Sequence, residues 1–68
     1  MKYWFVHFTG NVSYKAIADN ERLLYDMIRK EMNAQNKGES RSDKIFYRRH
    51  QEVTKQQYEE CSIVNTLN

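Results

Sequence analysis

The chain has 68 residues, enough for one small domain over residues 1–68 that would bury only about 60% of its unfolded surface. Eleven Lys and Arg residues oppose nine Asp and Glu residues, and the net charge of +2 argues against both a strongly basic DNA-coating protein and an acidic DNA mimic. The absence of a long apolar run argues against a membrane span.

The first predicted element is a strand at residues 2–9, because its apolar residues alternate. One face carries Trp4, Val6 and Phe8, and the other carries Tyr3, Phe5 and His7. Aromatic and β-branched residues on both faces indicate a strand that is at least partly buried on both sides. Gly10 and Asn11 tolerate positive φ and predict a turn. A second strand at 12–17 then completes a hairpin.

A helix is predicted at residues 20–34. Asp19 or Asn20 can cap its N-terminus, and Glu21 in the first turn favours the helix dipole. The apolar residues that recur at helical spacing are Leu23, Leu24, Met27, Ile28 and Met32. This amphipathic pattern predicts a helix with one face packed on the sheet.

Residues 35–43 show no periodicity around Gly38 and predict a mobile loop. A third strand is expected over residues 44–53, apolar at its start and polar toward its end. On regular strand geometry Arg48 and Arg49 point to opposite faces of the sheet.

The last predicted element is a short helix at residues 55–61, because Thr54 and Gln57 have the spacing of a capping box. The residues expected to face the body of the domain are Tyr58, Cys61, Ile63 and Val64. The tail at 65–68 is expected to fray. The predicted fold is α+β with the order β-β-α-β-α. A three-stranded antiparallel sheet has the most apolar strand at its centre and the long helix on one face.

Cysteine usage suggests the compartment. Cys61 has no second cysteine in the chain to pair with, whereas small secreted domains usually carry several. His7 and Thr9 interrupt the apolar start, and no cleavage site of small residues follows, so we expect no signal peptide. We therefore expect a reduced, cytoplasmic protein.

The chain offers little for metal binding or catalysis. His7, His50 and Cys61 are scattered without metal-ligand spacing, so no metal and no cofactor are predicted. Glu59 and Glu60 are adjacent and would splay about 100° apart on a helix. With only two glycines there is also no phosphate-binding loop. We expect a protein that is not an enzyme.

A basic segment at 37–49 carries five Lys and Arg residues against two acidic residues. Aromatic rings next to basic side chains on a sheet are typical of proteins that bind single-stranded nucleic acid. The candidate residues for binding RNA or single-stranded DNA are Lys44, Phe46, Tyr47, Arg48 and Arg49. Alternatively, the rings anchor the third strand and the arginines are solvated surface charges.

The first strand has more aromatic area than one helix can cover. Its second face is therefore either buried under the C-terminal helix or exposed as a contact surface for a partner or a second copy of the chain. The predicted protein-contact residues are Tyr3, Phe5, His7 and Tyr14, with Arg48 and Arg49 supplying charge complementarity.

Two segments, Lys2 to Asn11 and Glu52 to Glu60, carry a resemblance. The chain resembles short uncharacterised proteins of bacteriophages and bacterial mobile elements, in which a hairpin, a helix and a strand end in a Val- or Leu-Ser/Thr-Lys-x-x-Tyr helix start. The resemblance brings no catalytic residues with it. It implies a non-enzymatic module in the host cytoplasm that inhibits a host protein or protein–nucleic acid complex, including defence complexes. Nucleic-acid binding is the alternative function.

Overall fold

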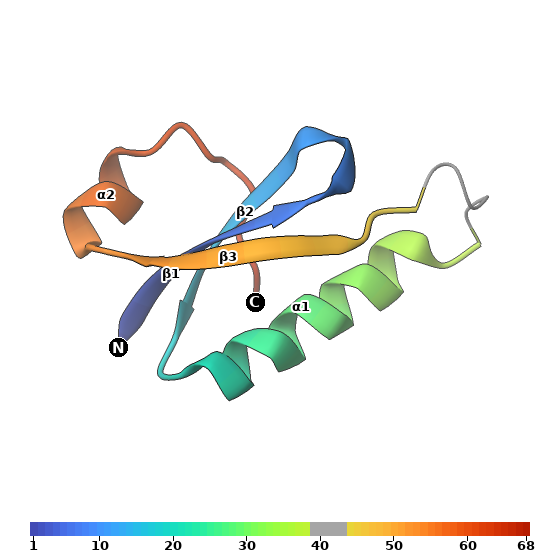
Figure 1. The fold of residues 1–68 in the computed structure, drawn as a ribbon, viewed down its shortest axis with the longest axis horizontal. Helices are drawn as coiled ribbons and strands as arrows, with labels where there is room; N and C mark the ends of the chain where they lie inside the picture. The colour runs from blue at the N-terminus through green and yellow to red at the C-terminus, as the bar shows by residue number, and fades with distance from the viewer. Residues whose placement is uncertain (39–43) are drawn as a thin grey trace.

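The computed structural model describes residues 1–38 and 44–68, and it confirms the predicted α+β fold (Figure 1). The elements are β1 (Lys2–Phe8), η1 (Thr9–Asn11), β2 (Val12–Ala18), α1 (Glu21–Asn36), β3 (Tyr47–Val53) and α2 (Lys55–Glu60). Within these described parts, neither α-helix is long and apolar enough to cross a membrane.

The three strands form one antiparallel sheet in the order β2-β1-β3. The central strand is β1, as its apolar composition predicted. Val6 lies opposite Tyr14 on one side and opposite His50 on the other, so these three side chains share a face of the sheet. Gly10 (φ 74°) and Asn11 (φ 59°) both adopt positive φ in the turn between β1 and β2.

Asn20, one of the two predicted caps, begins helix α1: its Oδ1 accepts a hydrogen bond from the backbone amide of Leu23. It extends to Asn36, two residues beyond the predicted end. Leu24 and Ile28 are its buried residues. Leu23 was expected in the core but is 44% exposed, because it projects from the side of the helix next to the outer edge of β2.

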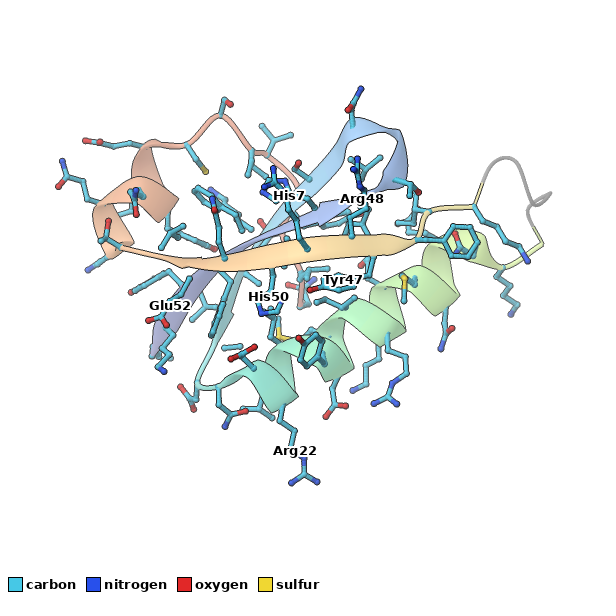
Figure 2. All side chains as sticks on the ribbon, in the orientation of Figure 1. His7, Arg22, Tyr47, Arg48, His50 and Glu52 are labelled. Carbon is cyan, nitrogen blue, oxygen red and sulfur yellow. The ribbon has the colours of Figure 1, made fainter. Side chains whose placement is uncertain are left out.

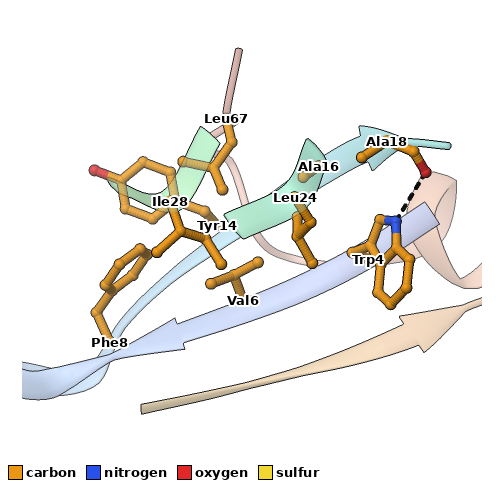
Figure 3. Packing of buried hydrophobic residues seen from close by; sticks show 9 residues of the cluster. All are labelled: Trp4, Val6, Phe8, Tyr14, Ala16, Ala18, Leu24, Ile28 and Leu67. Carbon is orange, nitrogen blue, oxygen red and sulfur yellow. Dashed lines mark hydrogen bonds between the residues drawn. The ribbon is translucent and has the colours of Figure 1, made fainter. Parts of the chain in front are cut away.

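The hydrophobic core lies between α1 and one face of the sheet (Figure 3). It consists of Trp4, Val6, Phe8, Tyr14, Ala16, Ala18, Leu24, Ile28 and Leu67. The Trp4 indole N–H is buried and donates to the carbonyl oxygen of Ala18 at 3.0 Å (Figure 3). This bond satisfies the polar atom that a buried tryptophan brings into a core.

Strand β3 begins at Tyr47 and not at residue 44. Before that point the backbone has other partners: the Asn36 side chain forms two 2.8 Å hydrogen bonds with the backbone of Ile45. Phe46 is bonded to Thr9 through both its amide and its carbonyl group. The predicted loop at 35–43 therefore starts later than expected, since residues 35 and 36 are helical, and residues 39–43 lie outside the described residues.

Helix α2 has the predicted capping box between Thr54 and Gln57. The prediction of a frayed tail at 65–68 is wrong: Leu67 is 3% exposed, and its amide donates to the carbonyl oxygen of Lys15 at the edge of β2. Val64, expected to face the body, is 85% exposed. The chain after α2 is not helical, so helical spacing no longer decides which side chains point inward.

Candidate functional site

The sheet has one face covered by α1 and a second face that we call the open face. In the register of the strands the open face consists of Tyr3, Phe5, His7, Ser13, Lys15, Ile17, Arg49, Gln51 and Val53. Figure 2 shows the separation of the two faces at β3: His7 and Arg48 lie on one side of the strand, and Tyr47 and His50 lie on the side toward α1.

A β-bulge in β3 decides where the two arginines point. His7 pairs with Arg49 and Phe8 pairs with Tyr47, which leaves Arg48 as an extra residue without a partner on β1. A bulge breaks the strict alternation of a strand and can turn a side chain to the other face. The prediction that Arg48 and Arg49 point to opposite faces is therefore wrong, because both side chains line one recess on the open face.

This recess lies where the turn between β1 and β2 meets the bulge, and it has a volume of about 380 Å³. We call it the basic recess. Its lining residues are His7, Phe8, Asn11, Ser13, Arg48 and Arg49. None of the six is acidic, so the recess concentrates positive charge in a protein whose overall charge is only +2.

The electrostatics of the basic recess act on His7. Its burial, followed by the positive charges of Arg49 and then Arg48, lowers the pKa of this imidazole below 6.5. His7 Nδ1 also lies 2.9 Å from Ser13 Oγ in a hydrogen bond. Neither arginine forms an ion pair within residues 1–38 and 44–68. Two guanidinium groups without a carboxylate partner there can accept an anionic group from another molecule.

The other end of the open face is partly covered by α2. The Tyr58 ring packs on Tyr3, with 5.1 Å between the ring centroids, and Lys15 Nζ lies 4.8 Å from the centroid of Tyr58. Tyr3, Phe5 and His7 are all half-buried. The aromatic surplus of β1 is therefore neither fully buried under α2 nor fully exposed, and its role as a contact surface stays a prediction.

Tyr14 does not belong to this surface. It lies opposite Val6, on the face covered by α1, and is only 8% exposed. Its hydroxyl donates to Glu31 on α1 at 3.3 Å, and its ring packs edge-on against Phe8. The prediction of Tyr14 as a contact residue is wrong, because paired residues of an antiparallel sheet share a face.

The residues predicted to bind nucleic acid are divided between two faces. Tyr47 points toward α1 and is half-buried, whereas Arg48 and Arg49 point to the open face. Lys44 and Phe46 precede the strand, and Phe46 is 49% exposed. Because Tyr47 contacts α1, it does not offer a stacking surface beside the arginines.

A chain of three polar side chains, which the sequence did not suggest, joins β3 to α1. His50 Nδ1 lies 2.5 Å from the Tyr47 hydroxyl, and His50 Nε2 lies 2.9 Å from Glu21 Oε2. This order of hydroxyl, imidazole and carboxylate is that of a nucleophilic triad. However, burial, the nearby Tyr25 and Glu21 raise the pKa of Tyr47, the opposite of what activates a nucleophile.

None of these three residues lines the basic recess or a second recess of about 330 Å³ between α1 and β2. The lining of that second recess includes the apolar side chains of Ile17 and Leu23 together with charged side chains of both signs. The polar chain therefore acts as a structural link between β3 and α1. Glu21 and His50 are 29 positions apart in sequence, so no local motif indicated this link.

Metal-ligating residues do not cluster in the described parts of the chain, where no group of three His, Cys, Asp or Glu side chains could hold an ion. Cys61 is a half-buried free thiol whose Sγ contacts the carbonyl oxygen of Tyr58 at 3.2 Å.

Ser13 and Asn11 are recess residues that the sequence interpretation missed. The turn at Gly10 and Asn11 was recognised, but the predicted strands at 2–9 and 12–17 leave a two-residue loop, which would place Tyr14 opposite His7. The loop has three residues, Thr9–Asn11, and places Ser13 opposite His7 instead. No feature of the sequence marked the bulge at Arg48 either.

Comparisons of the chain with protein-family models, with curated proteins and with solved structures find no significant match.

Proposed function

We propose that this chain is a non-enzymatic protein-binding module that uses the open face of its sheet. The observation that supports this function is the β-bulge, which brings Arg48 next to Arg49 on the face that carries Tyr3, Phe5 and His7. A half-buried aromatic strip beside guanidinium groups that form no ion pair among the described residues has the residue types that are enriched where proteins bind one another.

The partner we propose presents an acidic surface to the arginines. The resemblance to small phage and mobile-element proteins suggests a host complex as this partner, inhibited by occupation of its surface. Nucleic-acid binding remains the alternative function, and it has less support because Tyr47 is turned toward α1.

A pull-down from bacterial lysate with the tagged protein, performed with and without nuclease treatment, tests this function. Arg49→Glu reverses an exposed charge on the open face, and Arg22→Glu makes the same change on α1, where Arg22 points away from the sheet (Figure 2). We expect the wild type and Arg22→Glu to retain the same protein and Arg49→Glu to lose it. Equal retention by Arg49→Glu would contradict the proposed face, and capture that disappears with nuclease would favour nucleic acid.

A further inference from the structure

The charge of the basic recess matches that of a doubly charged anion. Arg48 and Arg49 contribute two permanent positive charges, and the other lining residues contribute no negative charge. Neither guanidinium forms an ion pair within the described residues. A single carboxylate would neutralise only one of the two charges.

The recess also has uncharged hydrogen-bond donors, and together with the two arginines they are more than the two oxygens of a carboxylate need. When the Ser13 hydroxyl donates to His7 Nδ1, the ring proton is on Nε2, for which no hydrogen-bond partner is found among the described residues. The Asn11 side chain adds an amide at the turn. One arginine fork satisfies both oxygens of a carboxylate, whereas a phosphate monoester has three terminal oxygens and a charge of about −1.5 to −2 at pH 7.

We propose that the recess formed by His7, Asn11, Ser13, Arg48 and Arg49 binds a phosphate monoester on a protein partner, as in a phosphorylated serine or threonine. That the phosphate belongs to a protein and not to another molecule rests on the proposed function. A protein is favoured over nucleic acid because, among the described residues, no Tyr or Trp lines the recess and its one phenyl ring, that of Phe8, is 1% exposed. Single-stranded nucleic acids are usually held by rings on which their bases stack.

The site itself is tested with inorganic phosphate as the probe, by NMR titration of the full chain at constant ionic strength. We expect saturable shifts at the His7 ring and at the amides of Ser13 and Arg49. Arg48→Gln and Arg49→Gln should each weaken phosphate binding about tenfold, the effect of losing a charged hydrogen bond. Arg22→Gln, the matched control on α1, should bind as the wild type does.

Acetate, titrated in the same way, distinguishes phosphate from carboxylate recognition. We expect acetate to bind at least about tenfold more weakly than phosphate, because it lacks the second charge. The absence of saturable phosphate shifts, unchanged phosphate binding by Arg49→Gln, or acetate binding as tight as phosphate binding would each overturn the proposal.

The source of the phosphate is tested with a phosphoserine peptide, the same peptide without phosphate, and an oligonucleotide with a 5′-phosphate. We expect the phosphopeptide to bind more tightly than both. Tighter binding of the oligonucleotide would overturn the proposal that the phosphate belongs to a protein.

The titration with inorganic phosphate contains no partner, so its failure is distinguishable from failure of the proposed function. Phosphate binding without any protein captured by the open face would contradict the function and leave the anion site standing. The absence of phosphate binding together with capture of a protein by the open face would contradict the anion site but not the proposed function.

Discussion

His50 on β3 lies with its Nε2 2.9 Å from a carboxylate oxygen of Glu21, so one side chain joins the sheet to the first turn of α1. The imidazole side chain is 14% exposed, whereas that of Glu21 is 60% exposed. An ion pair or hydrogen bond to such an exposed carboxylate contributes little, because water screens it. The packing of the imidazole against the Trp4 and Tyr25 rings contributes more.

We therefore predict a larger loss of stability for His50→Ala than for Glu21→Gln. Glu21→Gln should lower the free energy of unfolding by less than about 1 kcal/mol. His50→Ala removes a packed ring and the partner of the Tyr47 hydroxyl, and should cost about 1–3 kcal/mol. Urea denaturation measures both, with Glu52→Gln as a control on the same strand. Equal effects of the two substitutions would show that the ring does not link the elements.

The tail should contribute to stability through Leu67. Leu67→Ala removes a 3% exposed side chain from the core and should lower the free energy of unfolding by about 2–5 kcal/mol. Val64→Ala, at a position 85% exposed, should have almost no effect. Thermal or urea denaturation of the two variants checks this prediction, and a Leu67→Ala protein as stable as Val64→Ala would mean that the tail does not dock.

Stability should decrease in mildly acidic solution because of His7. Burial, Arg49 and Arg48 hold the pKa of His7 below its usual value of 6.5 in the folded protein. Between that lowered pKa and 6.5 the unfolded chain binds a proton that the folded protein does not, so stability falls as the pH falls through this window.

His7→Asn keeps a polar group near Ser13 and removes this titration. We expect the variant to lose less free energy of unfolding than the wild type when the pH falls from about 7.5 to about 5. Identical losses in urea denaturation would exclude the contribution of His7.

Two of the five tyrosines should ionise late when the pH is raised. Burial and Glu31 raise the pKa of Tyr14, and burial, Tyr25 and Glu21 raise that of Tyr47, both above 10.0. The unfolded chain therefore releases these protons first, and stability should fall as the pH rises above 10.0. Near-ultraviolet absorbance follows the ionisation, and Tyr14→Phe should remove one late step. A Tyr14→Phe titration that matches the wild type would contradict this assignment.

Local patterns were sufficient to predict the elements that depend on neighbouring residues. The alternation of β1, the cap at Asn20 and the capping box at Thr54 all operate within a few residues, and each is present as predicted. The central position of β1 followed from its apolar residues on both faces, since a central strand is the one with most of its surface covered.

Features that depend on distant contacts were not predictable in this way. The backbone of Ile45 forms its hydrogen bonds with the side chain of Asn36 and not with a neighbouring strand, so β3 starts later than predicted. Leu67 is buried because the C-terminal tail forms a backbone hydrogen bond with Lys15 at the edge of β2. The open face was predicted in part: Tyr3, Phe5 and His7 share a face as their spacing required. The position of Arg48 beside Arg49 depends on the bulge, which no periodic pattern indicates.

The most direct test of the basic recess is the pKa of His7, measured by NMR in the wild type, Arg48→Gln, Arg49→Gln and Arg22→Gln. Both arginines on β3 lower this pKa, so removing either one should raise it toward 6.5, while Arg22→Gln should leave it unchanged. The contradicting result is a pKa of His7 that responds to Arg49→Gln alone, because Arg48 would then lie on the face toward α1, as in a strand without a bulge.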